Sequence, residues 1–167
     1  MKKIHLTGED LEEILAVSKS FVETDGTGYK RRANYNYQDM NIGMAGERAF
    51  EKFSGYKWNK EASSYCGPRA DFYDEQGHGI QVKTCSYGGP GPKELKLKPK
   101  ETISITHHKN NIRKLVLCYY NFRHDPNNCY LIGEISVDNF IKKKKDKIYG
   151  NNVLHIVEEY NLDKIYK

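Results

Sequence analysis

Residues 70–84 read Ala-Asp-Phe-Tyr-Asp-Glu-Gln-Gly-His-Gly-Ile-Gln-Val-Lys-Thr, and this stretch decides the expected fold. Polar and apolar residues alternate on both sides of a short polar centre, which is typical of two strands. Gly77 can adopt a positive φ near that centre, so the pattern predicts an antiparallel hairpin with a loop of about three residues. In that register Asp71 lies opposite Gln81, with Cβ atoms roughly 4.5–5.5 Å apart. Lys83 projects two residues further along the same face.

An upstream glutamate completes a set of polar residues: Asp71, then Gln81-Val82-Lys83, with Glu47 in the helical stretch Gly43–Phe50. This set resembles the active-site pattern of the PD-(D/E)xK nuclease superfamily. The resemblance implies an α+β fold with a restriction-endonuclease-like core, in which helices flank a mixed β-sheet. A chain of 167 residues is long enough to bury such a core, and we expect one domain over residues 1–167.

The sequence departs from the superfamily pattern at two positions. Pro68 precedes Asp71 by three residues rather than by one, and Gln81 stands where Asp or Glu is usual, although some members carry Gln there. The amide oxygen of Gln81 can ligate a hard cation but brings no charge. We therefore expect a metal ion to be held less tightly unless Glu47 supplies a second carboxylate.

The resemblance assigns a role to each residue of this set. Asp71, the side-chain oxygen of Gln81, the backbone carbonyl of Val82 and Glu47 would bind Mg²⁺ or Mn²⁺. Lys83 would orient the attacking water and stabilise the charge that develops on phosphorus. The implied activity is that of a Mg²⁺-dependent DNA endonuclease of the restriction, homing or repair and recombination type. Superfamily members that cut both strands often act as homodimers, so the resemblance also implies a dimer.

Basic residues gather in three places, and such clusters attract polyanions. The net charge is +5, and one cluster is the run Lys142–Lys145. We expect DNA contacts from six residues in or near the other two clusters and the hairpin: Lys30, Arg31, Arg32, Arg69, Lys96 and Lys98. Residues 22–37 interleave arginine with tyrosine, which predicts a DNA-contacting loop or, alternatively, a loop whose tyrosines pack on the first helix.

Two alternatives keep these features and change the function. With Gln81 neutral, the chain could be a nuclease-like module that binds nucleic acid without hydrolysing it. In the second alternative, residues 70–84 form an ordinary amphipathic surface of an interaction domain unrelated to nucleic acid. A metal site that depends on Asp71 separates an enzyme from the binding module, and salt-sensitive DNA binding counts against the interaction domain.

Periodicity and capping residues predict the remaining elements. Thr7 and Asp10 cap a helix over residues 8–20, and Gly55 ends a second helix over residues 38–54. The other expected elements are strands at 95–98, 102–106, 114–122, 129–135 and 153–157, and a short helix that Ser136 or Asp138 opens before the lysine run. The apolar run within 114–122 is typical of a central strand.

The four cysteines form no CxxC pair and have no closely spaced histidine, so the sequence supports neither a zinc ribbon nor a redox motif. Cys85, Cys118 and Cys129 fall in strand-like runs, where we expect small core residues. His107-His108 is interpreted as a surface or phosphate-contacting pair rather than a metal site. No apolar run suits a signal peptide or a membrane span, so we expect a soluble, cytoplasmic protein with no membrane partner.

Overall fold

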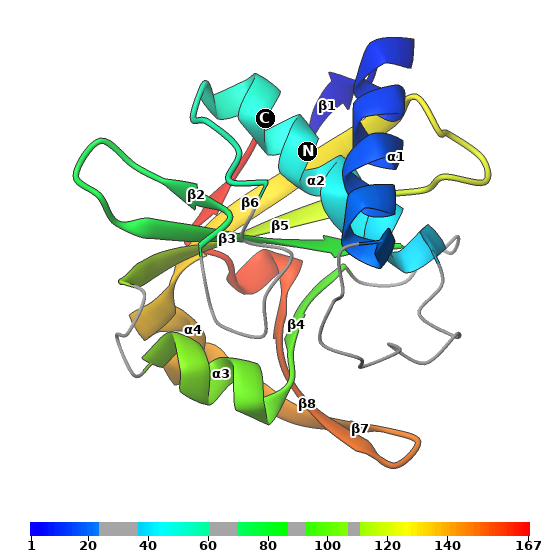
Figure 1. The fold of residues 1–167 in the computed structure, drawn as a ribbon. Coiled ribbons are helices and arrows are strands. Elements are labelled where there is room, and N and C mark those ends of the chain that lie inside the picture. The colour runs from blue at the N-terminus through cyan, green and yellow to red at the C-terminus, as the bar shows by residue number, and fades with distance from the viewer. Residues whose placement is uncertain (24–36, 61–69, 87–92, 107–110) are drawn as a thin grey trace.

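A curled, mixed β-sheet with helices on both of its faces organises the α+β fold (Figure 1). The computed structural model describes residues 1–23, 37–60, 70–86, 93–106 and 111–167. The strands of the main sheet are β1 (Lys2–His5), β2 (Phe72–Tyr73), β3 (Gly79–Cys85), β5 (Ile112–Tyr120), β6 (Asn128–Ser136) and β9 (Lys164–Ile165). Their order is β1-β6-β5-β3-β2, and β9 also pairs with β6.

Among the described pairs of the main sheet, β3 and β5 alone run parallel. Between them the chain forms β4 (Glu94–Leu97) and α3 (Pro99–Thr106), which provide the crossover that parallel strands require. β4 belongs to a second, antiparallel sheet of order β4-β8-β7, with β7 (Lys145–Tyr149) and β8 (Asn152–Glu158). This second sheet, α3 and α4 (Val137–Lys143) cover one face of the main sheet.

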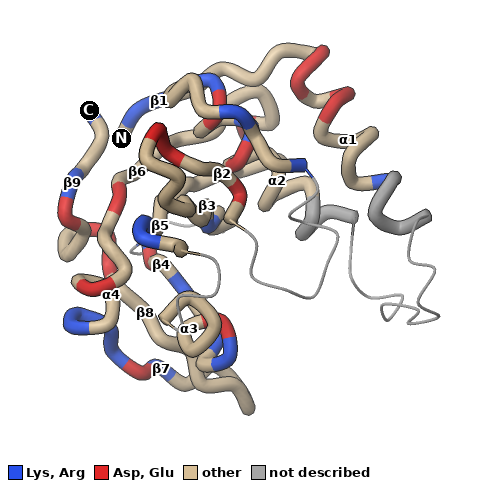
Figure 2. The backbone as a smooth tube through the Cα atoms, turned by 60° about the vertical axis from the view of Figure 1, so that its left-hand side comes forward, with Lys and Arg blue, Asp and Glu red and all other residues tan. Residues whose placement is uncertain are grey.

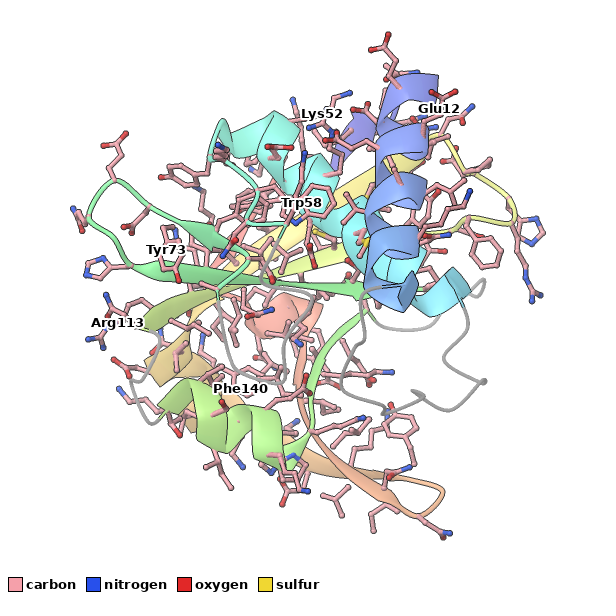
Figure 3. All side chains as sticks on the ribbon, in the orientation of Figure 1. Glu12, Lys52, Trp58, Tyr73, Arg113 and Phe140 are labelled. Carbon is pink, nitrogen blue, oxygen red and sulfur yellow. The ribbon has the colours of Figure 1, made fainter. Side chains whose placement is uncertain are left out.

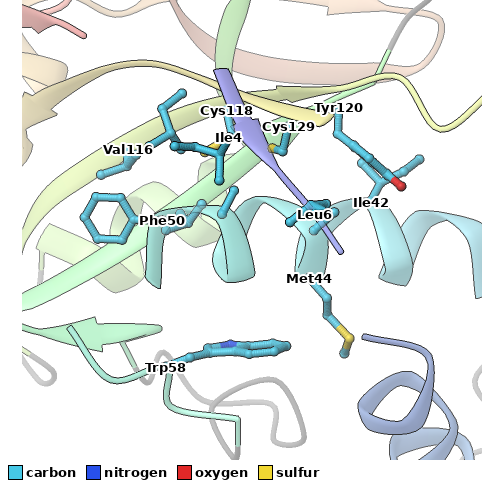
Figure 4. Close-up of a cluster of buried hydrophobic side chains, with 14 of the residues drawn as sticks. Ile4, Leu6, Ile42, Met44, Phe50, Trp58, Val116, Cys118, Tyr120 and Cys129 are labelled. Carbon is cyan, nitrogen blue, oxygen red and sulfur yellow. The ribbon is translucent and has the colours of Figure 1, made fainter. Parts of the chain in front are cut away.

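Both faces of β5 are buried, which is why its sequence lacks polar alternation. Val116 and Cys118 belong to the apolar cluster that includes residues of α1 (Gly8–Glu23) and α2 (Tyr37–Ser54), shown in Figure 4. Leu115 and Leu117 belong to the opposite cluster, with α3, α4 and the second sheet. The predictions of a central strand and of its antiparallel partner β6 are therefore confirmed. Cys118 and Cys129 are fully buried, as expected of small core residues.

The first helix begins and the second ends where their capping residues predict, while α1 continues to Glu23, beyond its expected end at residue 20. The backbone N of Asp10 donates to Thr7 Oγ1 (3.3 Å), the backbone N of Thr7 donates to Asp10 Oδ2 (2.7 Å), and Gly55 has a φ of 75°. Asp10 also pairs with Arg48 (2.8 Å) and Lys52 (2.5 Å), so α1 packs on α2 while α2 lies on the main sheet. Within the described ranges, no helix is both long and apolar enough to cross a membrane.

The prediction of a strand at residues 102–106 is wrong, because these residues form the second half of α3. Pro99 begins this helix, at the position where a fixed φ and a missing N–H cost nothing. Ile105 is buried whereas Ile103 is 54 % exposed, so the two isoleucines do not share a face. Over only five residues, the spacing of apolar side chains in this helix resembles the alternation of a strand.

Three strands, β1, β7 and β9, were not predicted from the sequence. Each is short and mostly exposed, so its side chains carry little hydrophobic periodicity. β1 and β9 both pair with β6, and β7 pairs with β8. Their pairing is therefore decided by partners distant in sequence or by a turn, rather than by an apolar pattern of their own.

Gly46 allows the close approach of α2 to β3. A Cβ at Gly46 would lie 1.9 Å from Thr84 Oγ1 and 3.2 Å from the Cβ of Cys118. Because Thr84 is β-branched and stiff, Gly46→Ala should lower the free energy of unfolding by about 1–3 kcal/mol. Urea unfolding measures this loss, and Thr84→Ala in the same chain should recover part of it.

Gly43→Ala is the matched control on the same helix, because a Cβ there meets nothing within 4 Å. This variant should be neutral or more stable by up to about 1 kcal/mol, since alanine favours helix over glycine. Equal destabilisation by the two substitutions would contradict the proposed close packing at Gly46.

Candidate active site

The hairpin of β2 and β3 has the register that the sequence predicts. Phe72 pairs with Ile80 and Tyr73 with Gly79, and the backbone N of Asp74 donates to His78 O (3.0 Å). The three-residue loop between Asp74 and His78 ends at Gly77, whose φ is 77°. Continuing this register by one pair places Asp71 opposite Gln81.

The Asp71 carboxylate takes the place of a backbone partner just before β2 begins, where the pairing of β2 with β3 stops. Its Oδ2 accepts hydrogen bonds from Gln81 Nε2 (2.7 Å) and from the backbone N of Val82 (2.7 Å). The N–H and C=O of one strand residue point to the same side in an antiparallel pair. The Val82 carbonyl therefore lies on the strand edge that faces Asp71, as its expected role as a metal ligand requires.

Helix α2 brings Glu47 to this group of residues. Trp58 (labelled in Figures 3 and 4) lies in the segment after α2. It donates its ring N–H to Glu47 Oε2 at 2.5 Å. Glu47 is 9 % exposed, Asp71 4 % and Trp58 2 %. The indole thus orients a buried carboxylate, and the sequence analysis had given Trp58 no role.

The two buried carboxylates have raised pKa values. For Glu47, burial and the charge of Asp71 raise the pKa well above its ordinary value, while the Trp58 hydrogen bond and Lys83 oppose the shift. For Asp71, burial raises the pKa to about 6, although hydrogen bonds from Val82 and Gln81 and the charge of Lys83 act against it. Burial therefore favours the neutral, protonated form of both carboxylates.

The available donors fit a hard divalent cation, which prefers oxygen ligands. Among the described residues, no group of three or more His, Cys, Asp or Glu side chains could hold a metal ion. The neutral oxygens of Gln81 and Val82 would therefore complete a set that Asp71 and Glu47 begin. A divalent cation there would offset the repulsion that raises the pKa of Glu47.

Lys83 is held by a residue that the sequence analysis missed. Its Nζ donates to Glu101 Oε1 (2.9 Å), and Glu101 Oε2 accepts a hydrogen bond from the backbone N of Lys98 (2.7 Å). Burial acts to raise the pKa of Glu101, but the charge of Lys83 and the Lys98 hydrogen bond outweigh it and lower that pKa. The signal for Glu101 was present, because proline and glutamate at the first and third positions mark a helix start.

The structure thus brings together residues from α2, β3 and the segment before β2, with α3 supplying the partner of Lys83. No protein-family model and no curated protein matches this chain. What the site can do is therefore inferred from its own residues. These are buried carboxylates beside amide and carbonyl oxygens, with an ammonium group that is hydrogen-bonded to Glu101.

Of the six residues expected to contact DNA, the structure describes Lys96 and Lys98. Lys98 is exposed, as expected. Lys96 is half-buried instead of pointing outward, because its Nζ lies 3.3 Å from Glu94 Oε2 and 4.7 Å from the ring centre of Tyr149. The others, Lys30, Arg31, Arg32 and Arg69, lie outside the described residues, as does His107-His108.

The raised pKa values predict how stability depends on pH. Asp71 and Glu47 bind protons more tightly in the folded chain than in the unfolded chain, so their contribution to the free energy of unfolding should fall as pH rises from about 4 through 6 and beyond. Glu47→Gln removes one buried charge and keeps an acceptor for Trp58. In urea unfolding with a chelator, this variant should be more stable than wild type at pH 8, with a smaller difference at pH 4.

Glu12→Gln is a suitable control, because Glu12 is exposed on the outer side of α1 (Figure 3). It should leave the pH dependence of wild type unchanged. Lower stability of Glu47→Gln than of wild type at pH 8 would show that the buried carboxylate is not a source of repulsion.

Proposed function

We propose that the protein is a metal-dependent DNA endonuclease of the PD-(D/E)xK superfamily. The observation that carries the proposal is the contact between the Asp71 carboxylate and Gln81-Val82, with buried Glu47 near enough for the charge of Asp71 to act on it. Lys83 follows on the same strand, within electrostatic reach of both carboxylates. This is the arrangement that the sequence resemblance implies for hydrolysis of a phosphodiester bond.

The fold is compatible with a restriction-endonuclease-like core. A mixed sheet is flanked by helices, and the candidate residues lie on a hairpin at one side of that sheet. α2 lies against β3, the strand that carries Gln81 and Lys83, and it presents Glu47 to them. α2 and β3 therefore hold Glu47 and residues 81–83, and two hydrogen bonds to β3 fix Asp71 just before β2.

Asp71, Glu47 and the oxygens of Gln81 and Val82 would hold Mg²⁺ or Mn²⁺. When bound, such an ion polarises the scissile phosphate and lowers the pKa of a water nucleophile. Both carboxylates must be deprotonated to act as ligands, so metal affinity should rise as pH increases through about 6. The superfamily usually has a carboxylate where this chain has Gln81. In this proposal, Glu47 supplies that second negative charge instead.

Lys83 would contact the phosphate and orient the nucleophile. A lysine ammonium is a point charge on a flexible side chain. Fixing it in one position for catalysis costs rotamer entropy unless a partner already holds it there. The 2.9 Å hydrogen bond to Glu101 restricts the Lys83 ammonium to the side of the sheet where α3 lies. Glu101 is thus a positioning residue in this proposal.

Lys83→Ala should lower metal-dependent DNA cleavage by about 100-fold or more, because general acid–base and charge-stabilising groups typically contribute factors of that size. DNA binding should stay close to that of wild type, since the phosphate contacts elsewhere remain. Cleavage of plasmid, single-stranded and branched DNA with Mg²⁺ measures the first effect, and fluorescence anisotropy with a labelled duplex measures the second.

Lys114→Ala on the neighbouring strand β5 removes the same charge and serves as the control. Lys114 is paired with Glu134 (3.3 Å), and its charge is not among those that shift the pKa of Asp71 or Glu47. Undiminished cleavage by Lys83→Ala, or an equal loss in both variants, would overturn the assignment of Lys83.

Gln81→Glu tests whether the amide oxygen is a metal ligand. The new carboxylate should tighten Mn²⁺ binding by roughly tenfold, because affinity at such sites follows the number of charged ligands. Without metal at pH 8, the variant should be less stable than wild type, since it loses the hydrogen bond from Gln81 Nε2 to Asp71.

Calorimetric titration with Mn²⁺ measures the affinity of Gln81→Glu, and Gln76→Glu provides the control. Gln76 is exposed in the loop of the same hairpin, so its substitution adds an equal charge at a distance from the site. Equal Mn²⁺ affinities for wild type and Gln81→Glu would remove Gln81 from the set of ligands.

A nuclease-like module that binds nucleic acid without cutting it is the second candidate function. The observation that favours it is the neutral Gln81, whose amide N–H₂ stabilises Asp71 by a hydrogen bond where a metal ion would otherwise do so. Titration of wild type with Mg²⁺ or Mn²⁺ separates the two candidates. A binding module should show no metal site that is lost in Asp71→Asn.

A further inference from the structure

The hairpin of β7 and β8, here called the arm (residues 145–158), extends below the rest of the described chain in Figure 1. Ile148 and Val153 face each other as cross-strand neighbours near its tip and are 74 % and 44 % exposed. Gly150, with a φ of 58°, forms part of the two-residue turn between the strands. An exposed apolar pair at the end of a projecting ribbon has no role in the core.

The base of the arm is strongly basic. Five lysines occupy the six positions from 142 to 147, and Asp146 is the one acidic residue among them. Figure 2 shows this positive charge along the end of α4 and the start of β7. Lys145 lies 3.8 Å from Glu158 and Lys143 lies 3.0 Å from Asp163, but surface pairs of this kind contribute little and can exchange for phosphate.

Lys147 differs from the other lysines of the run 142–147. Its Nζ donates to buried Glu94 (2.8 Å), which also accepts a hydrogen bond from Tyr149 OH (2.7 Å). These contacts attach the arm to the body of the protein at β4. The arm is therefore a supported projection, with its exposed lysines and its apolar tip on the outside.

The arm and Lys83 lie on the same side of the main sheet. β8 pairs with β4, and α3 packs against β8 while its Glu101 holds the Lys83 ammonium. A polyanion bound across the candidate site from this side would also meet the arm. Lys98 and Lys100, both exposed at the start of α3, add positive charge on the same side.

We propose that the arm is a contact for duplex DNA, with the exposed lysines at its base on phosphates and with Ile148 and Val153 in the major groove. This inference rests on the proposed function, which supplies DNA as the substrate. The major groove is about 12 Å wide and admits a two-stranded β-ribbon, and apolar side chains there contact thymine methyl groups. Pairing of β7 with a second copy of the chain is disfavoured, because lysines along an edge strand oppose it.

The test measures the salt dependence of DNA binding without metal. A labelled duplex of about 30 base pairs, long enough for several phosphate contacts, is titrated with the full chain. The titration is repeated at different salt concentrations with a chelator present. Each lysine–phosphate contact contributes about 0.9 to the slope of log affinity against log salt, so Lys142→Ala/Lys145→Ala should reduce the slope by about 2. Lys2→Ala/Lys3→Ala, on the exposed edge strand β1, removes the same charge and should change the slope much less.

Substitution of the tip should act differently from substitution of the lysines. Ile148→Ser/Val153→Ser should lower duplex affinity several-fold with an unchanged salt slope, because no phosphate contact is lost. An unchanged slope for the Lys142/Lys145 variant, or an equal fall in the Lys2/Lys3 control, overturns the proposal. So does loss of a wild-type dimer in the tip variant without any change in DNA affinity, measured by sedimentation.

Cleavage assays separate failure of the arm from failure of the nuclease assignment. Cleavage by wild type, combined with wild-type salt dependence in the arm variants, overturns the arm as a DNA contact and leaves the nuclease standing. Binding that depends on the arm without cleavage in Mg²⁺ or Mn²⁺ overturns the nuclease alone. A wild-type chain that neither binds nor cleaves DNA overturns both.

Discussion

The candidate site depends on the Asp71 carboxylate, which lies where the backbone pairing of β2 with β3 stops. Asp71 Oδ2 accepts hydrogen bonds from Gln81 and from the Val82 backbone at the point where β2 no longer pairs with β3. This contact fixes the edge of β3 and buries the carboxylate near Glu47. The same interaction therefore sets the local fold and creates the electrostatic conditions on which the proposed chemistry relies.

Burying two carboxylates lowers the stability of the folded chain near neutral pH. Several contacts partly offset this loss of stability. Trp58 donates to Glu47, and Lys83 acts on both carboxylates while Glu101 holds its ammonium. A site of this kind is stabilised further when a cation binds, because binding to the folded state alone shifts the folding equilibrium. Local repulsion that remains in a folded protein is typical of functional sites.

The parts of the site that were predictable from the sequence are those set by local periodicity. The two-residue period of strands and Gly77 gave the hairpin register, and capping residues gave the start of α1 and the end of α2. The contact between Trp58 and Glu47 could not be predicted, because the segment after α2 has no regular period. Glu101 was missed because a short amphipathic helix was interpreted as a strand. The edge strands β1, β7 and β9 depend on partners or a turn rather than on a pattern of their own.

Proton release on metal binding tests the central claim most directly. Ligands with raised pKa values must lose their protons when they bind a cation, and calorimetric titration with Mn²⁺ in buffers of different ionisation enthalpy counts those protons. At pH 6 the account predicts Mn²⁺ binding by wild type with net proton release, and loss of that binding in Asp71→Asn. Mn²⁺ binding that persists undiminished in Asp71→Asn, or no binding by wild type, would contradict the account.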